Sequence, residues 1–172
     1  MVQQPYAVTK KPSLLKAILF AGLLAGTLDA LFAIADFTIA RHANPAIIFW
    51  YIASGALKSE PAIKDMLTAD AGTQTLYAVA GVLFHYFIAY MFVSLLFIIY
   101  PAIKKIFKSN VIVAVVYGIF VWVVMNYIVL PVAFTGYAPN YTWKTILSVL
   151  YLVIAIGFIG AVAAGKYYKK GR

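Results

Sequence analysis

Four long apolar runs, separated by polar stretches, set the pattern of this chain. They cover about residues 14–40, 75–100, 111–134 and 142–165. Each reaches or exceeds the ~20 residues with which a helix crosses the hydrocarbon core of a bilayer. Apolar residues continue around every side of these runs instead of alternating, which favours helices over the strands of a β-barrel. The pattern predicts an all-α integral membrane protein, a four-transmembrane-helix bundle forming one domain over residues 1–172.

A fifth apolar stretch, NPAIIFWYIASGALK, is shorter. Asn44 can cap a helix that has Pro45 in its first turn, and Gly55 can end it. Such an outer helix, about 45–55, would be ~15 Å long at the rise of an α-helix, half the thickness of a bilayer core. We therefore expect an interfacial or re-entrant helix between the first two spans. A short polar helix capped by Ser59 should follow it.

Composition supports the membrane interpretation. The chain is 65% hydrophobic and 11% charged, with a mean hydropathy of +0.92. A soluble domain carries about 25% charged residues, so this chain has too little charge to cover a surface that faces water.

The net charge of +9 is concentrated at the ends of the spans. Ten basic residues flank the ends that would share one side of the membrane: Lys10, Lys11, Lys16, Lys104, Lys105, Lys108, Lys166, Lys169, Lys170 and Arg172. By the positive-inside rule, both termini are cytoplasmic and residues 41–74 and 135–141 lie outside. The distribution indicates contact with the lipid bilayer and its anionic head groups, not with nucleic acid. A homo-oligomer or a larger membrane complex also fits so small a chain.

Enzyme chemistry has little support in the residue inventory. The chain has no cysteine and two histidines, which excludes thiol chemistry and leaves little for a metal site. His42 falls in a loop, and haem held by His85 would lack a second histidine in any span. The tripeptide around Ser54 resembles intramembrane serine peptidases, but these need a partner histidine. We expect no cofactor, no metal and no enzyme activity.

Residues 21–37 of the first span contain two carboxylates, Asp29 and Asp36, and no lysine or arginine. At 100° per residue they share an arc of roughly 80° with the smallest side chains of the span. This stripe consists of Gly22, Gly26, Asp29, Ala33, Asp36 and Ala40. A carboxylate facing lipid would cost about 2.5–3.5 kcal/mol, whereas small residues let another helix approach closely. The stripe is predicted to face the bundle.

Polar residues of the other spans fall at a similar depth. His85 shares a face with Gly81 and Ala89, and lies ~15 Å from the outer end of its span, as Asp29 does. Asn126, Ser148 and Tyr151 come near that level. The predicted ion- or ligand-binding residues are Asp29, His85, Asn126 and Tyr151, with Asp36 nearer the outside.

Structural and functional interpretations of this layer both stand. Asn126 and Tyr151 are typical of polar groups that only fix helix register. Ionisable groups within a membrane are functional candidates, and histidine titrates near neutral pH, so Asp29 with His85 can form a proton or cation site. Asp36 can be hydrated or paired with Arg41 or Lys58 near the membrane boundary.

Two further features concern helix shape. Pro131 is predicted to bend or end the third span after Asn126 and to free backbone carbonyls there. The small residues Gly157, Ala161 and Ala164 on the fourth span indicate close helix packing.

Three stretches carry a resemblance: AGLLAGTLDALFAIADF, HANPAIIFWYIASGALK and GVLFHYFIAYMF. They resemble a group of small polytopic bacterial inner-membrane proteins, with a distant similarity to YagU-like acid-resistance proteins. The resemblance covers the first two spans and the loop between them. It implies a bacterial inner membrane and a polytopic helical fold, and no mechanism.

Two functional hypotheses follow. The first is a small transport or channel-type protein with a proton- or cation-sensitive Asp29/His85 site. The second is a non-catalytic accessory or scaffold subunit of a membrane complex. A cavity reaching Asp29 would favour the first, and a dry polar layer the second.

Overall fold

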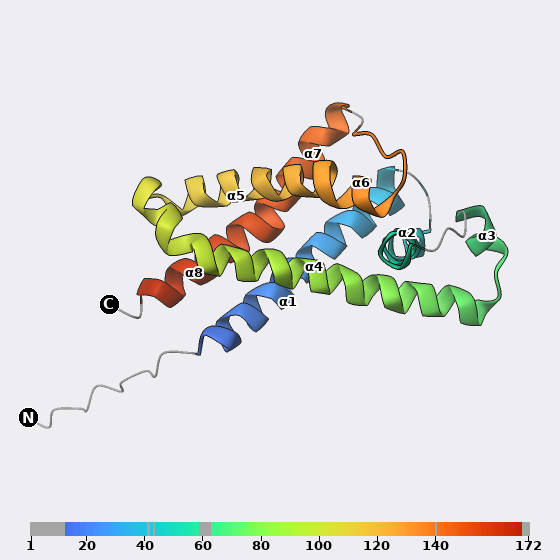
Figure 1. The fold of residues 1–172 in the computed structure, drawn as a ribbon, viewed down its shortest axis with the longest axis horizontal. Helices are drawn as coiled ribbons and strands as arrows, with labels where there is room; N and C mark the ends of the chain where they lie inside the picture. Colours follow the sequence, from blue (N-terminus) through green and yellow to red (C-terminus); the bar gives the residue numbers. More distant parts are fainter. Residues whose placement is uncertain (1–12, 41, 43, 59–62, 140, 170–172) are drawn as a thin grey trace, which may run out of the picture.

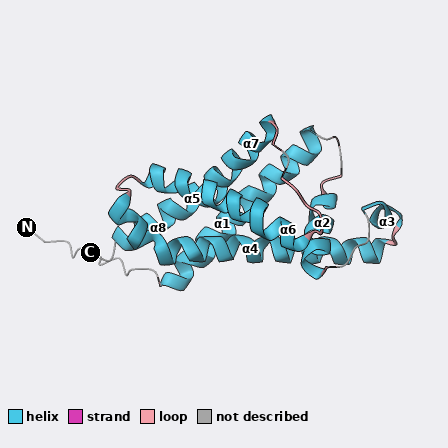
Figure 2. Ribbon diagram, turned by 45° about the horizontal axis from the view of Figure 1, so that its top comes forward, coloured by secondary structure: helices cyan, strands magenta, loops and turns pink. Residues whose placement is uncertain are grey.

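The fold comes from a computed structural model that describes residues 13–40, 42, 44–58, 63–139 and 141–169. The described residues form helices and loops and no strand, as Figure 2 shows. In chain order the elements are α1 (Leu14–Ala35), the π-helical turn η1 (Asp36–Ala40), α2 (Ala46–Leu57), α3 (Ile63–Thr68), α4 (Ala71–Ile106), α5 (Asn110–Val124), the π-helical turn η2 (Met125–Val129), α6 (Leu130–Ala133), α7 (Trp143–Leu152), the π-helical turn η3 (Val153–Phe158) and α8 (Ile159–Lys169).

Four continuous helical segments are long and apolar enough to cross a membrane. They are Leu14–Ile39, Ala71–Ile106, Asn110–Ala133 and Trp143–Lys169. The four predicted long helices are therefore confirmed, and the chain is a multi-pass membrane protein by length and composition.

The two ends of the bundle differ (Figure 1). The terminal end holds the start of α1, the end of α8 and the turn between α4 and α5. The distal end holds α2, α3, α6 and the start of α7.

The apolar core fills the half of the bundle nearer the terminal end. Its largest fully buried side chains in the spans are Leu96 and Phe97 of α4 and Tyr117 and Val121 of α5. The Tyr117 hydroxyl donates to the Phe92 carbonyl at 2.6 Å, so the one polar atom of this side chain is satisfied within the core. The interior of the terminal half is thus closely packed.

Glycines allow close helix crossings on two sides of this core. A Cβ at Gly26 would meet Tyr86 and Ala89 of α4, so the small-residue stripe of α1 packs on α4 as predicted. A Cβ at Gly157 would meet the Ala114 carbonyl of α5. Ala161 and Ala164 are fully buried, which agrees with a packing role for the small residues of the fourth span.

The short helix α2 crosses α4 steeply, since Figure 1 looks along α2 and across α4. Its 12 residues correspond to ~18 Å, too short to span. Trp50 anchors it, donating from Nε1 to the Gln74 carbonyl at 3.0 Å. The short outer helix of the sequence analysis is therefore present, and it lies across the bundle.

Helix α2 runs two residues past the predicted end at about Gly55. The helix continues to Leu57, and Lys58 ends it in the left-handed conformation with φ 49°. Gly55 is buried, and a Cβ at this position would meet the Phe134 ring. Asn44 does accept a hydrogen bond from the Ala46 N–H at 2.9 Å. The predicted cap at Ser59 lies outside the described residues.

Pro131 does not break the third span. The helix widens into η2 just before the proline and continues through α6 to Ala133. A wider turn accommodates a residue that lacks an N–H and crowds the preceding turn. The side-chain amide of Asn126 donates to the Trp122 carbonyl at 2.9 Å, next to this widened turn.

Helix α4 begins at Ala71, four residues before the predicted start of the span, and Asp70 caps it. Its carboxylate accepts hydrogen bonds from the Thr73 hydroxyl at 2.6 Å and from the Thr73 N–H at 3.0 Å. These bonds hold the pKa of the Asp70 carboxyl below its ordinary value of 3.8. The carboxylate therefore stabilises the start of the helix in its charged form.

Asp70→Ala should lower the thermal unfolding temperature at pH 7, because the first turn loses its cap. A depressed folded-state pKa adds stability above pH 3.8, and this stability is lost as the pH falls through the folded value. The difference between variant and wild type should therefore shrink below pH 3.8 in circular dichroism melts. Asp70→Asn retains a capping side chain and should melt closer to the wild type at pH 7. A pH-independent difference would contradict the charged cap.

Candidate functional site

A cleft of about 360 Å³ opens in the distal half of the bundle. We call it the distal cleft. Polar side chains from three spans line it: Asp29, Asp36, Asn126, Lys144, Ser148 and Tyr151. Four of the five residues predicted as a site therefore share one cavity, although they come from opposite ends of the sequence.

A second cavity of about 170 Å³ adjoins the cleft and lies deeper in the bundle. We call it the inner cavity. Asp29 and His85 both line it, and Ile48, Phe49 and Ile52 of α2 form part of its wall. Asp29 and Ala33 line both spaces. The fifth predicted residue, His85, thus meets Asp29 in the inner cavity and is absent from the lining of the distal cleft.

His85 is held by a backbone acceptor. Its Nε2 lies 2.8 Å from the Gly26 carbonyl oxygen, so this nitrogen carries a proton and donates. The ring packs edge-on against Phe49 and Tyr86, with centroids 6.3 and 5.5 Å away. In the neutral ring Nδ1 is then an acceptor.

Asp29 and His85 interact through space. The carboxylate is close enough to the imidazole for an electrostatic interaction, while the hydrogen bond of the ring goes to Gly26. The pair therefore keeps a carboxylate and a titratable imidazole facing one cavity. This arrangement can take up a proton or a small cation between the two groups.

Asn126 and Tyr151 have partners of their own. Asn126 Oδ1 accepts from the Tyr137 hydroxyl at 2.9 Å and its amide donates within its own helix. The Tyr151 ring stacks on Phe32, with centroids 4.8 Å apart. These contacts fit the interpretation that both residues fix the walls of the distal cleft.

Asp36 and Lys144 bring opposite charges to the same cleft. Asp36 begins η1 at the distal end of the first span. Lys144 lies in the first turn of α7, and its ammonium is 5.9 Å from the centroid of the Trp143 ring. The predicted partner Arg41 lies outside the described residues.

Lys144 was not among the site residues predicted from the sequence. A signal was present, because Lys144, Ser148 and Tyr151 are spaced i, i+4, i+7 and share one helix face. Trp122 was also missed. Its Nε1 donates to the Ser148 hydroxyl at 3.0 Å and joins the third and fourth spans at the cleft.

All three π-helical turns among the described residues contribute to the two cavities. Asp36 of η1, Met125 and Asn126 of η2, and Ile156 of η3 line them. π-Helical turns are rare and often mark functional sites, because they shift the side chains that follow them around the helix. Each widened turn therefore contributes at least one lining residue, although Ala155 and Ile156 of η3 also belong to the packed core.

The inner cavity ends on the packed core. Phe92 and Ile156 line it and are 6% and 2% exposed, and Leu96 one turn further is fully buried. The described residues thus give Asp29 an approach from the distal side, with apolar packing between it and the terminal end.

Two alternative chemistries gain no support from this geometry. Among the described residues, no three His, Asp or Glu side chains gather where they could hold a metal ion. The Ser54 hydroxyl donates to the Trp50 carbonyl of its own helix at 2.8 Å. This is the ordinary intrahelical hydrogen bond of a serine, whereas a serine nucleophile donates to a neighbouring base.

Comparison of the chain with protein-family models, with curated proteins and with solved structures finds no match. The resemblance to YagU-like proteins stays a prediction.

Proposed function

We propose that this protein is a small membrane transport protein whose proton- or cation-sensitive site is formed by Asp29 and His85. The observation that carries the proposal is the pair of adjoining cavities: Asp29 lines both, and His85 lines the inner cavity with it. A structural polar layer would instead be tightly packed.

The chemistry of the lining supports a charged solute. Ionisable side chains are costly within a membrane, and here two carboxylates and one lysine face a cavity together. A carboxylate and an imidazole at the deep end provide oxygen and nitrogen groups whose charge depends on pH. A proton or a small monovalent cation fits these groups better than an anion or an apolar molecule.

The packed terminal half makes an alternating mechanism more suitable than an open channel. Phe92 and Leu96 lie between Asp29 and the terminal end, so a solute must wait for these side chains to separate. The rocking of one helix pair against another at the glycine crossings is the kind of motion that opens such a layer.

The direct experiment is flux in proteoliposomes. Purified protein should carry protons or monovalent cations down an imposed gradient, read by an internal pH dye or a cation-selective dye. Flux equal to that of protein-free liposomes, for protons, sodium and potassium alike, would contradict the proposal and favour an accessory subunit.

The proposal includes a location in a bacterial inner membrane with both termini in the cytoplasm. The positive charge at the terminal end supports this orientation. Because the chain has no cysteine, a thiol can be placed at Leu67 in α3 or at Lys105 at the end of α4, both exposed. An impermeant thiol reagent added to intact cells should label Leu67→Cys and spare Lys105→Cys. The reverse result would invert the topology.

A further inference from the structure

A groove of about 480 Å³ runs between α1 and α8 at the terminal end of the bundle. Its walls are apolar side chains, among them Phe20 and Leu24 of α1 and Phe158 and Val162 of the fourth span. Phe20 is 66% and Phe158 49% exposed, so the groove faces outward from the bundle. In a membrane this face meets lipid chains.

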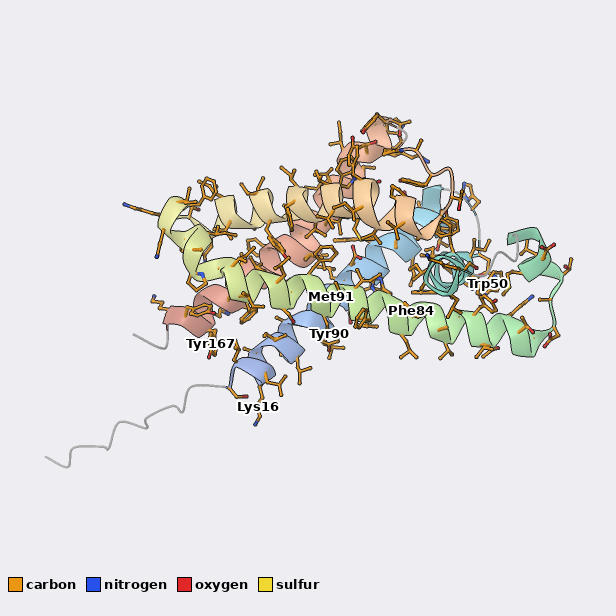
Figure 3. The ribbon with its side chains drawn as sticks, in the orientation of Figure 1. Lys16, Trp50, Phe84, Tyr90, Met91 and Tyr167 are labelled. Carbon is orange, nitrogen blue, oxygen red and sulfur yellow. The ribbon has the colours of Figure 1, made fainter. Side chains whose placement is uncertain are left out.

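Two lysines lie in the same groove. Lys16 comes from the first turn of α1 and Lys166 from the last turns of α8, and both are exposed. Tyr167 lines the groove beside them. Figure 3 shows Lys16 and Tyr167 at the terminal end, where α1 begins and α8 ends. Positive charge is thus placed at one end of an apolar slot, where a membrane would have its head groups.

We propose that this groove binds one anionic phospholipid. The phosphate lies between the ammonium groups of Lys16 and Lys166, and an acyl chain occupies the apolar slot toward Leu24 and Phe158. Basic pockets between helices at a membrane surface recognise lipid head groups in this way. A second copy packed groove against groove would leave both lysines facing an apolar partner, because no carboxylate is among the described residues that line the groove.

The proposal is tested by native mass spectrometry in mild detergent, with phosphatidylglycerol and phosphatidylcholine of identical chains added in turn. The wild type should keep one phosphatidylglycerol in preference to phosphatidylcholine. Loss of two surface lysines corresponds to about a 30-fold change in affinity for an anionic lipid, so K16Q/K166Q should bind phosphatidylglycerol about 30-fold more weakly. K105Q/K108Q removes the same charge elsewhere at the terminal end and should bind it within a few-fold of the wild type.

A second variant separates the chain slot from the charges. Val162→Phe fills the groove while keeping both lysines, and it should also lower the affinity for phosphatidylglycerol. Equal losses in K16Q/K166Q and K105Q/K108Q would show diffuse surface attraction and overturn the site. Unchanged affinity of Val162→Phe for phosphatidylglycerol, or binding of inorganic phosphate as tight as that of phosphatidylglycerol, would contradict a lipid as the occupant of the groove. A dimer that K16Q/K166Q does not change and Val162→Phe disrupts would identify a second copy as the occupant. Transport activity enters none of these readouts.

Discussion

Replacing Asp29 by asparagine should abolish ion-coupled flux in proteoliposomes while leaving the protein folded and at least as stable as the wild type. The substitution keeps the shape of the side chain and removes its charge from both cavities. A carboxylate within a membrane costs about 2.5–3.5 kcal/mol on insertion scales, so its removal should not destabilise the bundle. Lost activity with retained or higher stability is the combination expected of a residue kept for function.

Asp65→Asn is the matched control, since it makes the same chemical change on exposed α3. Its flux should equal that of the wild type. His85→Gln can keep the hydrogen bond to Gly26 and should reproduce the loss seen for Asp29→Asn. If the pair acts as a unit, the double variant is no worse than either single one. Intact flux with lowered stability in Asp29→Asn would make the aspartate a structural residue and remove the transport proposal.

Gly81→Ala should destabilise the protein by about 2 kcal/mol in reversible unfolding from detergent micelles, within the range of overpacking in cores. A Cβ at this position would overlap the backbone of Phe49 in α2, and a backbone cannot rotate aside. The intrinsic preference has the opposite sign, because alanine favours a helix over glycine by about 1 kcal/mol. We expect the overlap with the Phe49 backbone to outweigh the helix preference of alanine. Helix α2, which forms part of the wall of the inner cavity, should then move away from it.

Gly22→Ala provides the matched glycine control. Its Cβ would meet the ring of Tyr90, a partly buried side chain that can rotate aside at the cost of its hydrogen bond to the Leu19 carbonyl and without a backbone shift. This variant should lose much less stability than Gly81→Ala. Equal stability of Gly81→Ala and the wild type would mean that α2 does not approach α4 as closely as the structure shows.

The spans could be predicted from the sequence because length and hydropathy decide them directly. Their ends could not be predicted as closely. The second span was predicted to start at about residue 75, and the role of Asp70 became clear from its hydrogen bonds to Thr73. Gly55 looked like a helix end, whereas close packing against Phe134 explains the glycine. Local signals mark where a helix can end, and tertiary contacts decide where it does.

The candidate site could be predicted because a carboxylate within a membrane faces the interior of the bundle and its other polar groups. Helical periodicity then placed Asp29, Asp36 and the small residues on one inner face. What periodicity could not give is the division into two cavities, because this division depends on how far the helices separate. Residues of all three described π-helical turns line the two cavities. Pro131 signals η2, but nothing in the local sequence signals η1 or η3.

The central claim is that water reaches Asp29 from the distal side, and cysteine accessibility tests it most directly. Ala33→Cys lines both cavities and Ala30→Cys lines the inner one, whereas Ala25→Cys lies in the packed core with no exposed surface. All three are alanine-to-cysteine changes on one helix of a chain without cysteines, and Asp29 stays in place. An impermeant thiol reagent added outside intact cells should modify positions 33 and 30 and spare position 25. Protection of all three positions, with Leu67→Cys fully modified, would show a dry layer and contradict the account.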